Sequence, residues 1–148
     1  MIDLKTIHEM WSKDCEINSN ELDKSSRAQP ILHAKYLELL STYKLQLKRA
    51  EFAQKQLLKD KWLWYNGKMS HDEIIEKGWD PDPFNGLKVL KGEMEYYYDA
   101  DPEIQKSEEK IQYFKTVIDT LTEIVNNINW RHQTISNIIK WKQFESGN

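Results

Sequence analysis

The sequence predicts an all-α protein in which two long amphipathic helices are accompanied by shorter ones. Strand signals do not stand out, because apolar and polar residues do not alternate and valine is scarce. Apolar residues instead recur three and four positions apart over residues 31–65 and 102–144, which is the spacing of a helical seam. The composition, with 39% hydrophobic and 30% charged residues, is typical of long helices that complete their core by association.

The N-terminal region predicts a short helix followed by a second, capped one. The short helix carries three apolar residues on one face, namely Leu4, Ile7 and Trp11. In the stretch INSNEL, Asn18 is the expected N-cap of the next helix and Glu21 stands at the capping-box position. That helix runs toward Pro30, which either kinks it, ends it or lies in the first turn of a new helix.

A long helix is expected from residue 31 to residue 65. Its seam residues alternate four and three apart: Tyr36, Leu40, Tyr43, Leu47, Ala50, Gln54, Leu57, Lys61 and Trp64. The seam is apolar up to Leu57 and mixed beyond it. Gly67 is expected to end the helix in a left-handed conformation.

The segment after Gly67 predicts a linker with short helices. Ser70 is the expected N-cap of a brief helix, with Glu73 at its capping-box position and Gly78 at its end. The run 80–83, with two prolines, predicts an extended loop. Residues 87–98 predict a second brief amphipathic helix.

The last helix has the clearest start signal, with Asp101 as N-cap and Pro102 at the first helical position. Its seam is expected to contain Ile104, Ile111, Phe114, Ile118, Leu121, Val125, Ile128, His132, Ile135 and Ile139. His132 is expected to be a buried polar residue that sets the register, and Gly147 is expected to end the helix.

Because one small monomer leaves parts of two such seams uncovered, we expect self-association. The chain is accordingly divided into three regions: 1–68, 69–100 and 101–148.

Composition and termini limit the class of protein. The sequence contains no apolar run of 18 residues, so no membrane span is expected. The charged N-terminal stretch lacks the apolar core of a signal peptide, so export is not expected. Cys15 is the one cysteine in the sequence, which fits a reducing cytoplasm.

Charge is distributed unevenly along the chain, although the overall net charge is only −3. Residues 44–68 carry seven basic and two acidic residues, whereas residues 69–109 carry four basic and twelve acidic ones. A basic segment in an acidic protein indicates a local anion site. The alternative is a solvated helix face held by salt bridges, and charge alone does not separate the two.

The stretch LLKDKWLWYNGK, residues 57–68, interleaves lysines with aromatic residues. Ammonium groups that contact phosphates and rings that stack on bases are what sequence-independent binding of single strands requires. Paired bases in a duplex are already stacked, so single strands fit better. In the alternative interpretation the aromatic residues close the apolar face of the helix, and Trp64 lies on the seam. The candidate DNA-binding residues are Lys48, Arg49, Lys55, Lys59, Lys61, Trp62, Trp64, Tyr65 and Lys68.

Other chemistries find little support in the sequence. The stretch NGKMS is not a phosphate-binding loop, because Met69 separates Lys68 from Ser70 and a helix precedes it. His71 and the acidic residues after it lie at a helix N-terminus, where acidic residues are common. We therefore expect no catalytic residue, no metal site and no cofactor, and a metal-dependent enzyme using residues 71–82 ranks last.

Several short motifs, taken in order, resemble the UvsY family of recombination mediators from T-even-like phages. They are INSNEL, HAKYL at 33–37, LLKDKWLWYNGK, LKGEM at 90–94 and the closing QFESG. The resemblance covers roughly residues 9–147, and WYNGKMS and GWDPDPF place it nearest the marine-phage branch. The fold it implies is helical and homo-oligomeric.

The resemblance also implies a function and its partners. The family's basic motif falls on Lys59 and Lys61, and its aromatic residues fall on Trp64 and Tyr65. Lys61 lacks the planar fork of the arginine that the family can carry there, and Asp60 stands between the two lysines. The implied partners are single-stranded DNA, a RecA-like phage recombinase and the phage single-strand-binding protein.

A ring of six or seven subunits is the implied assembly, acting in the cytoplasm of the infected bacterial host. The residues assigned to self-association are Ile111, Phe114, Ile118, Leu121, Val125, Ile128, Ile135 and Ile139. In this interpretation the protein is not an enzyme, because the recombinase uses the ATP. The second hypothesis is a helical structural or adaptor protein that binds no nucleic acid.

Overall fold

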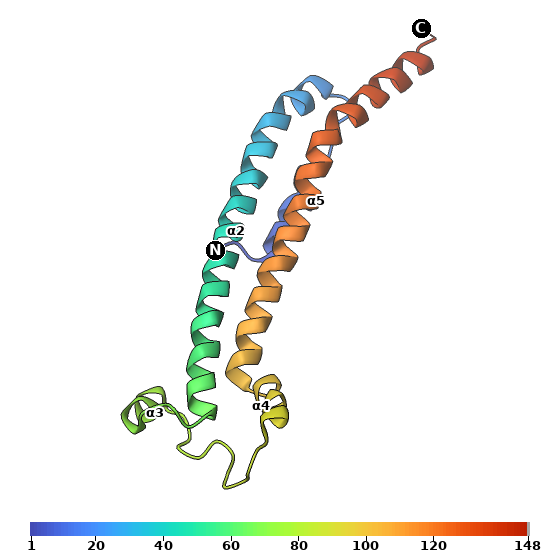
Figure 1. The fold of residues 1–148 in the computed structure, drawn as a ribbon. Coiled ribbons are helices and arrows are strands. Elements are labelled where there is room, and N and C mark those ends of the chain that lie inside the picture. The colour runs from blue at the N-terminus through green and yellow to red at the C-terminus, as the bar shows by residue number, and fades with distance from the viewer. Residues whose placement is uncertain (148) are drawn as a thin grey trace. The chain divides into compact units, whose positions relative to one another are not determined.

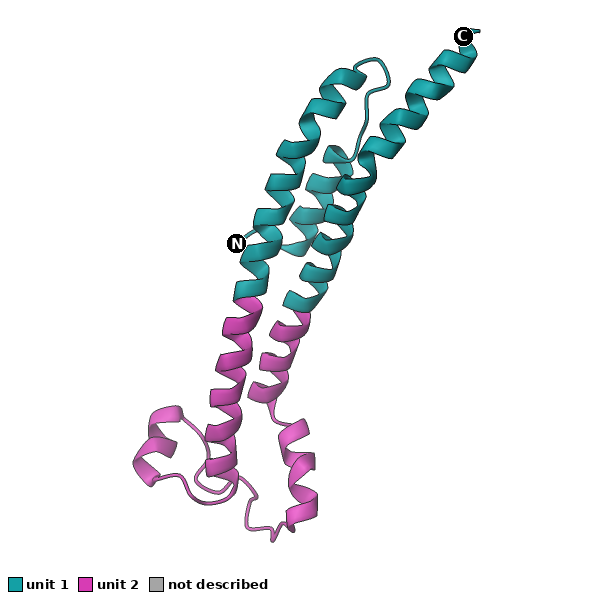
Figure 2. Ribbon diagram, turned by 45° about the horizontal axis from the view of Figure 1, so that its top comes forward, with its two compact units in different colours: residues 1–45, 114–148 teal, residues 46–113 magenta. Residues whose placement is uncertain are grey.

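The computed structural model describes residues 1–147 (Figure 1). Its elements in chain order are α1 (Leu4–Asp14), α2 (Leu22–Tyr65), α3 (His71–Lys77), the 3₁₀ helix η1 (Lys91–Glu93), α4 (Met94–Asp99) and α5 (Pro102–Glu145). The described residues contain no strand, so the predicted all-α fold class is confirmed. The chain forms two compact units, one of residues 1–45 and 114–148 and the other of residues 46–113 (Figure 2).

The first helix is predicted correctly, but the start of the second is not. The carboxylate of Asp3 caps α1 by accepting a hydrogen bond of 2.8 Å from the Thr6 amide. Asn18, the expected N-cap of the next helix, instead accepts from the amide of Asn20, two residues on. Its side chain therefore stabilises a turn. The carbonyl of Glu21 accepts the first helical bond, and α2 begins at Leu22.

In the first unit, α1, the N-terminal part of α2 and the C-terminal part of α5 lie side by side (Figure 2). Ile7, Tyr36 and Tyr43 are fully buried or nearly so. The ring of Tyr43 meets Phe114 of α5 edge-on, with the ring centroids 5.8 Å apart. The hydroxyl of Tyr36 donates to Asp14 at 2.8 Å, which ties α2 to the end of α1. Aromatic residues thus contribute to the core of this unit beside aliphatic ones, and Tyr36 also supplies a polar link between α2 and α1.

Arg131, rather than His132, is the buried polar residue of α5. The Arg131 guanidinium donates to the carbonyls of Asp14 and Cys15 at 3.3 Å and of Glu16 at 3.0 Å. These carbonyls lie at the C-terminal end of α1, where a cation is favourable. The prediction for His132 is wrong because the buried seam continues one residue earlier, and the imidazole is exposed.

Replacement of Arg131 by alanine is expected to lower the free energy of unfolding by about 2–4 kcal/mol, because three carbonyls at the end of α1 lose their donor. Urea denaturation followed by circular dichroism measures the effect. The matched control is His132→Ala, an exposed neighbour whose replacement is expected to change stability by about 0.5 kcal/mol or less. Equal stability of Arg131→Ala and the wild type would refute the anchoring role.

The seam predicted for the long helix is confirmed. All nine of its side chains are buried or partly buried. Pro30 lies inside α2 and does not end it. Because proline has no N–H, the carbonyl of Ser26 lacks its usual helical donor. Pro30 and Ser26 are both exposed, so water can bind that carbonyl. Gly67, with φ of +68°, follows the last turn of α2 as expected.

The α5 seam is confirmed in outline and corrected in register. Val117 and Ile124 are buried, whereas Ile118 and Val125, beside them in sequence, are only partly so. Of the residues assigned to self-association, the chain itself buries five: Ile111, Phe114, Leu121, Ile128 and Ile135. Ile139 is 41% exposed. Contacts between subunits through the buried five remain a prediction.

The connecting segment contains the short helices that its capping signals predict. The Ser70 hydroxyl accepts from the Glu73 amide at the start of α3, and Gly78 ends that helix with φ of +70°. The helix expected over 87–98 begins later, with η1 at residue 91 and α4 at residue 94. Asp101 caps α5 by accepting from the amides of Glu103 and Ile104.

Candidate nucleic-acid interface

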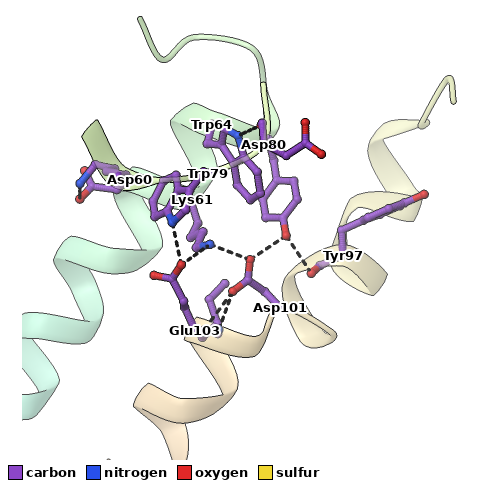
Figure 3. Close-up of polar contacts among 11 residues, drawn as sticks. Asp60, Lys61, Trp64, Trp79, Asp80, Tyr97, Asp101 and Glu103 are labelled. Atoms are coloured by element: carbon purple, nitrogen blue, oxygen red, sulfur yellow. Dashed lines mark hydrogen bonds and ion pairs between the residues drawn. The ribbon is translucent and has the colours of Figure 1, made fainter. Parts of the chain in front are cut away.

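Lys61 lies at the centre of a buried polar cluster in the second unit (Figure 3). Its side chain comes from the last turns of α2, and the residue is only 2% exposed. The ammonium nitrogen lies 3.0 Å from a carboxylate oxygen of Asp101 and 3.4 Å from one of Glu103. It also lies 4.0 Å from the ring centroid of Trp79 and 4.6 Å from that of Trp64. The ammonium group of Lys61 is therefore already engaged in contacts within the chain, which leaves it unavailable to a phosphate.

Trp64 and Tyr65 are buried in the same region. The indole N–H of Trp64 donates to the carbonyl of Asp80 at 2.8 Å. The hydroxyl of Tyr65 donates to the Asp101 carboxylate at 2.7 Å. Both rings belong to an apolar cluster with Met69, against which partly buried residues of the connecting segment pack. In this arrangement neither ring has a free face for a base.

The pKa of Asp101 reflects these contacts. Burial raises the pKa of this carboxyl, but hydrogen bonds from Tyr65 and the Ile104 amide, together with the Lys61 ammonium, lower it below its usual value. Burial and the hydrogen bond to Asp101 raise the pKa of the Tyr65 hydroxyl. At neutral pH the cluster therefore contains a charged carboxylate with a neutral phenol as its donor.

The remaining candidate DNA-binding residues are exposed. They are Lys48, Arg49, Lys55, Lys59, Trp62 and Lys68. Trp62 is 45% exposed, and the ammonium nitrogen of Lys68 lies 4.6 Å from its ring centroid. The structure thus divides the nine candidates into six on the surface and three, Lys61, Trp64 and Tyr65, in the interior.

Most of the exposed candidates lie in one row along α2. Its members alternate four and three residues apart, which places them on one helix face: Lys48, Phe52, Lys55, Lys59 and Trp62. We call these five residues the exposed row. The buried seam follows the same spacing on the opposite side of the helix. Sequence reasoning missed Phe52, although counting back from Trp62 by threes and fours reaches it.

The cations of the exposed row are largely free of carboxylates. In the described part of the chain, Lys55 and Lys59 have no ion-pair partner within 4.0 Å. Lys48 lies 4.0 Å from Glu51. Asp60 is turned toward Lys77 of α3, at 3.3 Å, so its charge is partly neutralised there. The row therefore presents positive charge available to an anionic ligand.

Metal-binding clusters and membrane spans are both absent from the described residues. Among residues 1–147, no three His, Cys, Asp or Glu side chains gather in a way that could hold a metal ion. Over the same residues, no helix is long and apolar enough to span a bilayer.

The fold and the exposed row define an all-α protein in which α2 presents a cation-rich, aromatic face, a surface suited to a polyanion. The family model described as "Recombination, repair and ssDNA binding protein UvsY" matches residues 10–148. The chain belongs to this family, as its motifs predicted. Recombination mediation is therefore its function class.

Characterised relatives agree with this assignment. "Recombination protein uvsY" of Enterobacteria phage T4 is 26% identical over 144 residues, which are 97% of this chain and 98% of that protein. A crystal structure of the bacteriophage T4 recombination mediator protein UvsY, lattice type II, matches with a TM-score of 0.82 and 25% identity over 99% of each chain. Lattice type I gives a TM-score of 0.78 and 26% identity over 93% of this chain and 97% of that one.

Proposed function

We propose that this recombination mediator binds single-stranded DNA, without sequence specificity, through the exposed face of α2. The observation that carries the proposal is the row of exposed lysines and aromatic rings opposite the buried seam. Lysines neutralise successive phosphates, and Trp62 offers a ring on which any base can stack. Arg49 and Lys68 extend the positive surface beside the row. The proposed contacts read no base edge, so no sequence preference is expected.

Lys61, Trp64 and Tyr65 take a different role in this proposal. Their contacts with Asp101, Glu103 and the aromatic rings of the connecting segment fix the end of α2. They are positioning residues, which hold Lys59, Trp62 and Lys68 in place. Two carboxylates of the acidic segment 69–109, the buried one of Asp101 and the exposed one of Glu103, are thereby paired within the chain.

Self-association is the second part of the proposal, with a ring of six or seven subunits as the assembly. Repetition of the DNA-binding face would convert a weak site into tight binding by avidity. Near the end of α5, Ile139 is exposed together with Trp141 and Phe144. The last two rings stack with centroids 5.5 Å apart. We assign this exposed end of α5 to contacts between subunits.

The proposed reaction sequence involves no covalent step in this chain. Wrapping of the strand weakens the hold of the phage single-strand-binding protein and presents the DNA to a RecA-like recombinase, which uses the ATP. The site of action is the cytoplasm of the infected bacterial host.

A helical adaptor that binds no nucleic acid is the second candidate. The burial of Lys61, Trp64 and Tyr65 favours it, because these residues then serve packing alone. The two candidates differ in salt dependence, since phosphate contacts weaken steeply as salt rises and a packed aromatic cluster does not.

The test is fluorescence anisotropy of a labelled oligo-dT, and of a duplex of equal length, at several salt concentrations. Tight binding of the single strand with a steep salt dependence, and weaker binding of the duplex, is expected. Light scattering at micromolar concentration gives the assembly state, and a monomer would contradict the ring. Absence of oligo-dT binding at low salt would favour the adaptor. ATP hydrolysis by the phage recombinase, on DNA coated with single-strand-binding protein, then tests the loading step.

A further inference from the structure

The exposed row contains an aromatic ring that lies outside the basic stretch 57–68. The ring of Phe52 is 58% exposed. The ammonium nitrogens of Lys48 and Lys55 lie 5.1 and 5.9 Å from its centroid. Burial does not explain this phenylalanine, because it lies on the face opposite the seam.

Phe52 and Trp62 form a repeat along one face of α2. They are ten residues apart, or about 15 Å along the helix axis. Lys55 and Lys59 lie between them on the same face and have no ion-pair partner in the described part of the chain. The order along the face is therefore ring, cation, cation, ring, which suits a chain of alternating phosphates and bases.

We propose that Phe52 is a second base-stacking platform and that the DNA strand runs along the exposed row from Lys48 to Trp62. This inference rests on the proposed function and adds Phe52 to Trp62 as a ring of the exposed row that stacks on a base. One base stacks on the Phe52 ring while Lys55 contacts a neighbouring phosphate. Lys48 contributes less, because Glu51 lies 4.0 Å from its ammonium group.

The salt dependence of binding distinguishes stacking from phosphate contact. Phe52→Ala is expected to lower the affinity for oligo-dT at least about fivefold at every salt concentration, with an unchanged slope of log K against log[salt]. Lys55→Ala is expected to make that negative slope shallower by about 0.7. Phe52→Trp keeps a ring and is expected to retain binding. The control is Tyr96→Ala, which removes an exposed ring in α4, outside the row.

Photocrosslinking gives a direct readout on the wild-type protein. A thymidine oligonucleotide with 5-iodouracil at single positions is irradiated in the complex, and the crosslinked residue is identified by mass spectrometry. Crosslinks at Phe52 as well as Trp62 support the inference. Binding by the wild type with no crosslink at Phe52, and equal affinity of Phe52→Ala, overturns it and leaves the proposed function intact. A wild type that fails to bind oligo-dT overturns the proposed function and this inference together.

Discussion

Replacement of Lys61 by methionine is expected to lower the free energy of unfolding by about 3–5 kcal/mol, the cost of removing one partner from a buried ion pair. The variant keeps much of the side-chain volume but leaves the Asp101 carboxylate buried without its cation. It also removes the cation that lies 4.0 Å from the Trp79 ring centroid. Urea denaturation followed by circular dichroism measures the change. The matched control is Lys59→Met, an exposed lysine two residues away, for which about 0.5 kcal/mol or less is expected.

A second substitution separates loss of the ion pair from general damage to packing. Asp101→Asn removes the charge but keeps a side chain that can cap α5. The double variant Lys61→Met/Asp101→Asn is therefore expected to be more stable than Lys61→Met alone. A double variant no more stable than the single one would contradict the account, as would wild-type stability of Lys61→Met.

The same variants decide how Lys61 acts in DNA binding. A lysine that contacts a phosphate contributes to the salt dependence, whereas a positioning residue does not. Under conditions in which Lys61→Met remains folded, its slope of log K against log[salt] is expected to equal that of the wild type. A slope for Lys61→Met that is shallower by about 0.7 would show that Lys61 reaches the phosphate directly, as the family motif implies.

The fold could be predicted from the sequence wherever local chemistry determines it. Gly67 and Gly78 end their helices, and Ser70 and Asp101 cap theirs, because each effect depends only on residues a few positions away. The prediction for Asn18 was wrong because a side chain that can cap a helix can also close a turn. Helical periodicity predicted the seam of α5 but did not decide whether residue 131 or residue 132 lies on its buried face.

The candidate site could be predicted only in part, because burial depends on contacts that are distant in sequence. Lys61 pairs with Asp101, forty residues away, and no spacing rule connects the two. The position of Lys61 on the α2 seam was nevertheless a signal, because a lysine among seam residues is expected to be buried with a partner. Phe52 lies outside the densest aromatic stretch, so local composition does not single it out, although the spacing of the row reaches it.

Removal of three exposed lysines is expected to have the largest effect on function. The variant Lys55→Ala/Lys59→Ala/Lys68→Ala should reduce the slope of log K against log[salt] by about 2, since each phosphate of a single strand that is no longer neutralised lowers it by about 0.7. The affinity for oligo-dT at low salt should fall by about tenfold or more. The three side chains are exposed, so the thermal stability should stay close to that of the wild type. Anisotropy titrations over a range of salt concentrations measure the slope and the affinity.

The control for this variant carries the same change in net charge at other exposed positions, as Lys88→Ala/Lys91→Ala/Lys115→Ala. If positive charge acts only through the overall field of the protein, both triple variants weaken binding equally. If the face of α2 contacts the strand, the control keeps the wild-type slope. Equal losses of affinity would show that the lysines of α2 act only through the overall field and not by contact with the strand. Unchanged binding in both variants would remove the physical basis for a DNA-binding face on α2, and the contacts of Lys61 would then be explained by packing alone.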